Sequence, residues 1–185
     1  MSAETQTLDS LRTRFAAYRT MAERALDQMS DEAFVAPLGA VDPAAVLVKH
    51  VAGNLRSRWT DVLTTDGDKP DRQRDGEFEL SDADTRPALM AAWADGWRRL
   101  QHALADLAPD DLTRTVTIRA EPLSVIDAAL RSLAHTASHV GQIVLLAKHA
   151  AGDDWQTLSI PRGESEAYAA ERRSAAAQTT EASRS

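Results

Sequence analysis

Residues 133–149 read Leu-Ala-His-Thr-Ala-Ser-His-Val-Gly-Gln-Ile-Val-Leu-Leu-Ala-Lys-His. The stretch is apolar over most of a helical circumference, which is typical of a helix at the centre of an all-α domain. Upstream, Ser124 followed three residues later by Asp127 resembles a capping box, and Gly152 is a C-terminal stop signal. We therefore predict a central helix from residue 124 to about residue 151.

Three amphipathic helices precede this one. Apolar residues recur at steps of three and four in residues 5–29, 43–64 and 86–107, the pattern of helices that pack in a bundle. The second of them begins at Asp42-Pro43, a side-chain acceptor followed by the residue favoured at the first helical position. Residues 113–119 alternate polar and apolar side chains, which predicts a short extended segment or hairpin before the last helix.

The connection between the second and third helices is unusually long. Residues 65–79 have no apolar periodicity and contain both Gly and Pro, so we expect a lid, a binding loop or a crossover. Fifteen extended residues reach roughly 50 Å, whereas a 20-residue helix is about 30 Å long. The connection can therefore return along the bundle and leave helices two and three parallel. At the other end we predict a domain of residues 1–173, closing with a short helix at 164–173, and a disordered tail at 174–185.

Composition restricts the function classes. The chain has 185 residues and a formal net charge of −7, so a nucleic-acid partner held by phosphate contacts has little support. It has no Cys, and any metal must therefore have nitrogen and oxygen ligands, which suit Zn, Ni, Fe, Mn or Co. We find no signal peptide and no apolar run of the ~20 residues that span a bilayer. We therefore expect a cytoplasmic protein without a membrane partner.

Two histidines of the central helix are candidate metal ligands. His135 and His139 are four residues apart and lie on the same helical face, so both rings can reach one metal ion. Alternatively, each is a hydrogen-bonded core histidine. His50 projects from the apolar flank of the second helix, and sites in bundle cores are built from facing helices. Three neutral imidazoles would leave an open coordination position, as in catalytic sites. His102 and His149 are poorer candidates.

Polar residues near these histidines are candidates for substrate binding. Arg58 falls inside the apolar arc of the second helix, and Arg131 lies in one stripe with His135 and His139. Both could bind an anionic group near the metal, or else form buried salt bridges or extend to the surface. Asn54, one turn from His50, could orient a substrate or satisfy an internal hydrogen bond.

The catalytic residues are not identified by a motif. Thr136 follows His135 where the zinc-protease pattern His-Glu-x-x-His has its Glu base. A base must therefore come from elsewhere, or the metal itself must lower the pKa of its water. Gly53, Gly96 and Gly141 lie inside predicted helices, and we expect them to permit close helix approach.

Three segments together resemble the DinB/YfiT-like superfamily of metalloenzymes, in a branch of unknown function. They are Lys49-His-Val-Ala-Gly-Asn-Leu-Arg-Ser-Arg-Trp-Thr-Asp-Val-Leu-Thr-Thr-Asp-Gly-Asp-Lys-Pro, Arg74-Asp-Gly-Glu-Phe and His135-Thr-Ala-Ser-His-Val-Gly-Gln-Ile. The resemblance implies a four-helix bundle with up-down-down-up topology. It also implies a divalent metal, often nickel or zinc, on three histidines that match His50, His135 and His139. Relatives include bacillithiol-using thiol S-transferases, mycothiol-dependent maleylpyruvate isomerase and suspected hydrolases, and many are homodimers.

Two hypotheses of different classes follow. The first is an enzyme whose metal activates water or a low-molecular-weight thiol for attack on a small-molecule substrate. Because the chain has no Cys, any thiol must be a cosubstrate. The second is a non-catalytic, metal-binding or stress-response scaffold that dimerises through its helices, and it is favoured by the missing base.

Overall fold

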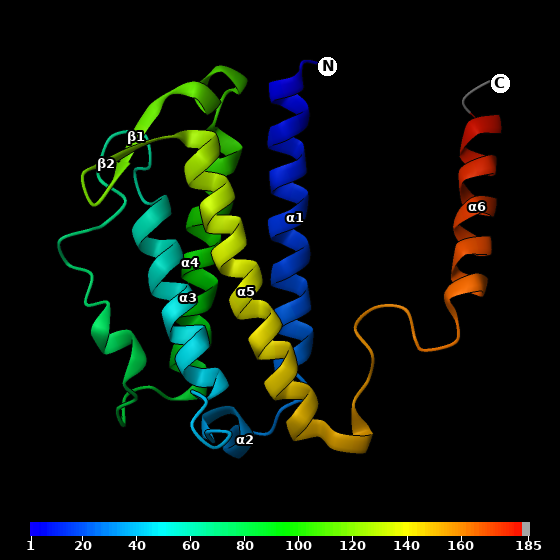
Figure 1. The fold of residues 1–185 in the computed structure, drawn as a ribbon, viewed down its shortest axis with the longest axis horizontal. Helices are drawn as coiled ribbons and strands as arrows, with labels where there is room; N and C mark the ends of the chain where they lie inside the picture. Colours follow the sequence, from blue (N-terminus) through cyan, green and yellow to red (C-terminus); the bar gives the residue numbers. More distant parts are fainter. Residues whose placement is uncertain (183–185) are drawn as a thin grey trace. The chain divides into compact units, whose positions relative to one another are not determined.

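The computed structural model describes residues 1–182. Within them the protein is mostly helical, with six α-helices and a small two-stranded sheet, so the predicted helical class is confirmed. The chain divides into two compact units, Met1–Asp153 and Asp154–Ser185. The long helices of the first unit lie side by side (Figure 1) and are α1 (Ala3–Leu26), α3 (Ala44–Trp59), α4 (Arg86–Asp106) and α5 (Val125–Ala151).

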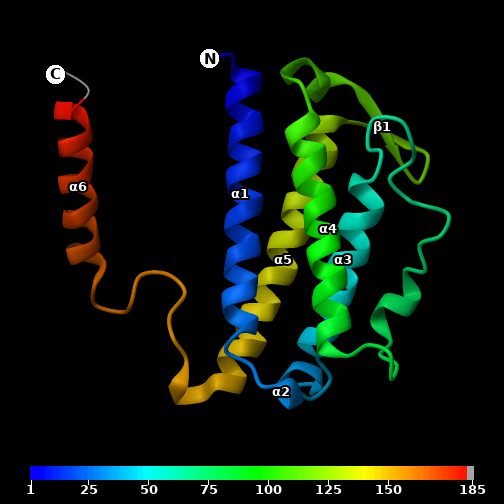
Figure 2. The ribbon, with the colours of Figure 1, turned by 180° about the vertical axis from the view of Figure 1, so that it is seen from behind.

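Each long helix packs against two of the others. Helix α3 contacts α4 and α5, and α1 contacts the same two helices. Helices α3 and α4 run in one direction, whereas α1 and α5 run in the opposite direction (Figure 1 and Figure 2). The short helix α2 (Asp31–Val35), which we did not predict, links α1 to α3. Trp93 and Trp97 of α4 and Phe15 of α1 are fully buried in the core.

The α3–α4 connection, residues 60–85, returns along the helices as the parallel orientation of α3 and α4 requires (Figure 1). It is not structureless, because a single 3-10 turn, η1 (Asp75–Phe78), packs against α3. Helix α3 ends at Trp59, earlier than the predicted residue 64. Thr60 is already extended and Asp61 has a positive φ of 49°, so the residues after them turn instead of continuing the helix.

The N-termini of two helices were predicted with different success. Ser124 caps α5 and its hydroxyl accepts a hydrogen bond from the Asp127 N–H at 3.2 Å, as predicted. At α3 the cap residue is Pro43, and Asp42 does not provide the predicted side-chain cap. At the other end of α5, Gly152 adopts a positive φ of 55° and ends the helix.

The extended segment before α5 is a hairpin of β1 (Thr115–Ile118) and β2 (Glu121–Ser124). The strands are antiparallel and Ile118 pairs with Glu121, so Arg119 and Ala120 form a two-residue turn. Both turn residues have positive φ, 57° and 61°. The hairpin lies at the end of the first unit where α5 begins (Figure 1).

Glycines inside the helices have three different environments. A Cβ on Gly96 would lie 2.8 Å from the backbone oxygen of Ala52, which confirms close approach of α4 to α3. At Gly53 the close neighbour is a side chain of the α3–α4 connection, not another helix. Around Gly141 no atom lies within 4 Å of an added Cβ, so the prediction of close packing there is wrong.

In the second unit, α6 extends over Ser165–Ala182. It continues beyond the short helix predicted to end at residue 173, and residues 174–182 are helical where we expected disorder. Ala is the commonest residue of α6, followed by Glu, and both are among the strong helix formers. Residues 183–185 of the predicted tail lie outside the described residues, and the domain boundary at residue 173 stays a prediction. Among the described helices, none has the length and apolar character needed to cross a membrane.

Candidate metal centre

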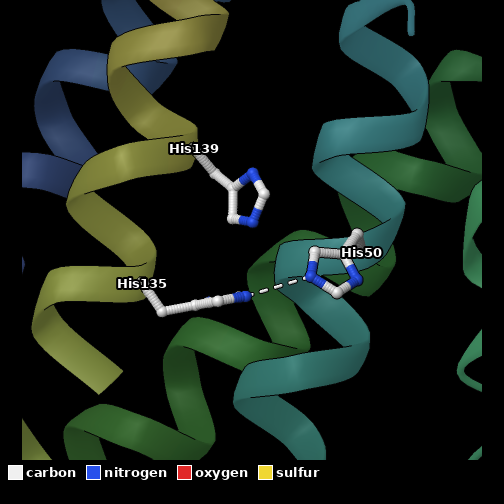
Figure 3. Close-up of side chains that lie close together, drawn as sticks. All are labelled: His50, His135 and His139. Atoms are coloured by element: carbon white, nitrogen blue, oxygen red, sulfur yellow. Dashed lines mark hydrogen bonds between the residues drawn. The ribbon is translucent and has the colours of Figure 1, made fainter. Parts of the chain in front are cut away.

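Three histidines from two helices face one point. His50 lies on α3, and His135 and His139 lie on successive turns of α5. One ring nitrogen from each can be chosen such that all three lie within 4.8 Å of one another. The Nε2 atoms of His50 and His135 are 3.0 Å apart. Figure 3 shows the three rings turned toward the space between the helices.

The α3–α5 contact is fixed close to these rings. The Trp59 indole N–H of α3 donates a hydrogen bond to the Ser132 hydroxyl of α5 at 3.0 Å, and both side chains are buried. Ser132 precedes His135 by less than one helical turn. A displacement of α5 along α3 would break this buried bond, so the spacing of the histidines is coupled to the packing of the two helices.

Glu77 of the α3–α4 connection orients His50. Its carboxylate accepts a hydrogen bond from His50 Nδ1 at 2.9 Å, and both side chains are buried. Because a carboxylate only accepts, Nδ1 carries the proton and Nε2 of His50 has a free lone pair. Arg72 donates from Nε and Nη2 to the same carboxylate, both at 2.8 Å. Burial alone would raise the pKa of Glu77, but the hydrogen bonds from Arg72 and His50 lower it below its usual value.

The two histidines of α5 are also prepared as neutral ligands. His139 Nδ1 lies 3.0 Å from the amide oxygen of Gln142, so Nδ1 donates and Nε2 has the lone pair. Burial, together with the neighbouring His139 and His50, lowers the pKa of His135 to about 4. Burial also lowers the pKa of His139. Neutral imidazole is the form that binds a metal.

The geometry fits a divalent ion held by three imidazoles. The two ring nitrogens 3.0 Å apart share a hydrogen bond. Because His50 donates its proton to the hydrogen bond with Glu77, His135 Nε2 is the donor in this bond, and a metal ion could take the place of its proton. For metal–nitrogen bonds of about 2.0–2.1 Å, tetrahedral ligands are about 3.3 Å apart. In addition, His135 Nδ1 is buried without a hydrogen-bond partner among the described residues. The three histidines could therefore hold a metal ion.

Comparison with known families shows the family of this chain. A family model described as "Protein of unknown function (DUF1572)" matches residues 2–164, which is most of the sequence. The chain belongs to the DUF1572 family. This family is DinB/YfiT-like, so the resemblance seen in the sequence is confirmed at the level of the family. No curated protein matches the chain.

Beside the three histidines, the protein has a cavity of about 180 Å³. His50, His135 and the three residues predicted to bind substrate, Asn54, Arg58 and Arg131, all line it. Arg58 also forms the alternative we considered, a salt bridge, because its Nη1 lies 3.1 Å from Asp68 Oδ1. Arg131 is 54% exposed at the cavity. The sequence therefore indicated side chains that do gather at one place.

The sequence did not identify Glu77 and Arg72 as parts of the three-histidine site. They lie in a polar, aperiodic connection, where sequence alone does not distinguish buried from exposed charges. One signal was present: Phe78 is an isolated aromatic residue in this connection, and it packs on the His50 ring with centroids 4.7 Å apart. Such an anchor indicates that this part of the connection packs on α3. Thr136, where a zinc protease has Glu, is itself fully buried and lies in the core.

Proposed function

We propose that this protein is a divalent-metal-dependent enzyme of the DinB-like superfamily, with the metal on His50, His135 and His139. The observation that carries the proposal is the convergence of three imidazoles beside a cavity. Nickel or zinc is the expected metal, and iron, manganese and cobalt suit the same ligands. When bound there, such an ion lowers the pKa of a coordinated water or thiol and supplies a nucleophile at neutral pH. The reaction would then be hydrolysis or thiol S-transfer.

The chain's own residues would serve this chemistry in separate roles. Glu77 holds His50 in the tautomer that leaves Nε2 free, a support that metal sites depend on. Asn54, Arg58 and Arg131 would contact the substrate in the cavity that they line. A thiol, if one is used, would enter as a cosubstrate, because the sequence has no Cys.

The alternative is a metal-binding scaffold without catalysis. It is favoured by the composition of the cavity, whose lining contains no Asp or Glu to act as a general base. A closed site would also favour it. Against it, the cavity adjoins two of the three histidines and leaves room for a small molecule. We therefore prefer the enzyme.

We extend the proposal to the assembly and its setting. Helices α1, α3, α4 and α5 would form a four-helix bundle of up-down-down-up type, and two copies would associate as a homodimer. A cytoplasmic location, a small-molecule substrate and the absence of nucleic-acid and membrane partners stay predictions from the sequence.

Metal analysis tests whether the protein binds a divalent ion, the first part of the proposal. Protein purified without chelators is expected to contain a divalent ion, or to bind stoichiometric Ni or Zn when titrated. Replacing a ligand by His139→Ala should abolish this binding, whereas His149→Ala, an exposed histidine on the same helix, should leave it intact. A wild-type protein that neither contains nor binds a divalent ion would overturn the proposal.

A turnover assay tests whether the metal-loaded protein is an enzyme, the second part of the proposal. The metal-loaded protein is expected to convert at least one member of a panel of esters, amides and electrophiles offered with low-molecular-weight thiols. The rate should disappear in His139→Ala and persist in His149→Ala. Metal binding without turnover of any panel member would favour the scaffold.

A further inference from the structure

We infer that the cavity beside the histidines binds an oxyanion, a carboxylate or phosphate group of the substrate. This inference rests on the proposed function, because it assigns a substrate class to the same site. Five arginines line the cavity, and no Asp or Glu is among its lining residues. The whole chain has a formal net charge of −7, so this local excess of positive charge is contrary to its general composition. The arginines are Arg58, Arg72, Arg74, Arg119 and Arg131.

Among the described residues, four carboxylates pair with the five arginines, which leaves one positive charge in excess. Three of the arginines each have a carboxylate of their own, in the pairs Arg72–Glu77, Arg74–Asp75 and Arg131–Glu121. Asp68 is shared, since it lies 3.1 Å from Arg58 and 3.0 Å from Arg119. Burial lowers the pKa of Arg58, and although Asp68 opposes this, the charges of Arg72 and Arg119 add to the lowering. Arg72 and Arg119 thus lie close enough to Arg58 to disfavour its charge. An anion placed among them would offset this effect.

Two of the arginines retain unused donors. Arg131 forms no hydrogen bond within the described residues, and its one ion pair there is a long one, with Glu121 at 3.6 Å. The side chain of Arg72 is only 5% exposed, and its Nη1 is buried without a partner among the described residues. A buried donor that lacks an acceptor is costly. Guanidinium groups match carboxylates and phosphates with paired, charge-assisted hydrogen bonds.

The arrangement also orients the substrate. Arg131 precedes His135 by four residues on α5, so the two side chains lie on the same face. Arg119 occupies the turn of the β-hairpin and lines the same cavity. The charged end of the substrate would lie between Arg119 and Arg131, and its reacting atom would point toward the histidines. Neutral molecules of the same size would lack this anchor.

The test is anion binding to metal-free protein, measured by isothermal titration calorimetry at constant ionic strength. Inorganic phosphate and succinate are the two probes, and they separate a phosphate site from a carboxylate site. Arg131→Gln should weaken binding of the preferred probe by about tenfold, the effect of losing a charge-assisted pair. Arg119→Gln should weaken it as well. Arg14→Gln, which changes the same charge at an exposed position of α1, should bind as wild type does.

Each outcome of this experiment either supports or overturns the inference. Binding of either probe that depends on Arg131 and Arg119 but not on Arg14 supports the inference. Absence of binding by both probes, or equal weakening by Arg14→Gln, overturns it. Because the protein is metal-free, these results do not depend on the metal. Anion binding in a protein that takes up no metal would leave the inference standing and the proposed enzyme refuted. Metal uptake without anion binding would do the reverse.

Discussion

Glu77 occupies the space that a side chain at Gly53 would need. A Cβ on Gly53 would lie 2.8 Å from Glu77 Cδ, closer than real Cβ atoms approach. The same carboxylate accepts the hydrogen bond from His50 Nδ1. The missing side chain at Gly53 thus lets the α3–α4 connection reach a proposed metal ligand.

Replacing Gly53 by Ala should therefore weaken metal binding without touching a ligand. The added methyl group would displace Glu77, and His50 would lose its fixed tautomer. Loss of such a supporting hydrogen bond typically reduces metal affinity about 10–100-fold. Competition with a chromogenic chelator would measure the change. Unchanged affinity in Gly53→Ala would contradict the role given to Glu77.

Gly141→Ala is the matched control, and its own result is predicted. Gly141 lies mid-helix on α5 with open space around a Cβ. Alanine is favoured over glycine inside a helix by about 1 kcal/mol, which raises the melting temperature by about 2–4 °C in a chain of this size. Metal affinity should not change. A loss of stability would contradict the open surroundings of Gly141.

Variants of Glu77 and Arg72 show whether Glu77 supports metal binding or only stabilises the fold. Glu77→Gln should lower metal affinity about 10–100-fold, and it should also destabilise the fold because Arg72 would remain buried without its partner. Adding Arg72→Gln should recover stability but not metal affinity. Chemical denaturation and chelator competition measure the two properties. Glu79→Gln, at an exposed position of the same connection, should change neither of them.

How far the sequence predicts this site depends on the range of the signal. The relation of His135 to His139 follows from helical periodicity and is local. That His50 meets them requires α3 to pack on α5, which the apolar arcs and the family resemblance indicated and the structure bears out. Glu77 was missed because its burial depends on where an aperiodic connection crosses α3, and the only signal of that contact was the isolated aromatic residue beside it, Phe78. The early end of α3 at Trp59 was missed because Val62 continues the apolar spacing beyond the last helical residue.

The strained turn of the hairpin allows a stability prediction. Ala120 has a φ of 61°, a left-handed conformation that costs an L-residue roughly 1–2 kcal/mol. Ala120→Gly should stabilise the protein by about 0.5–1 kcal/mol, because part of the gain is offset by the flexibility of glycine in the unfolded chain. Ala17→Gly, on an exposed face inside α1, should instead destabilise by about 1 kcal/mol. Denaturant titrations of both variants measure these changes in the free energy of unfolding. Destabilisation by both would show that the turn is not strained.

Asp66 holds the same turn, and its contribution should depend on pH. Its carboxylate accepts hydrogen bonds from the N–H groups of Asp68, Ala120 and Arg119 at 2.7, 2.8 and 2.9 Å. The bonds from Asp68 and Ala120 contribute most to holding its pKa far below the usual value for aspartate. A depressed pKa means that the folded state prefers the charged form. The stabilisation is therefore complete above the unfolded pKa, about 3.9, and is lost as the pH falls below it.

Asp66→Asn should accordingly be less stable than wild type at pH 7, because an amide nitrogen cannot accept these bonds. The difference in the free energy of unfolding should shrink as the pH falls from 5 toward 2, because Asp66 of the unfolded wild-type chain takes up a proton in this range while the folded state still favours the charged carboxylate. Urea titrations across this range measure the difference, and hydrogen exchange at Arg119 and Ala120 reports on the turn directly. Asp82→Asn, at an exposed position of the α3–α4 connection, provides the reference for a simple change of charge. A deficit in Asp66→Asn that is equal at pH 7 and pH 2 would show that the carboxylate charge does not stabilise the turn.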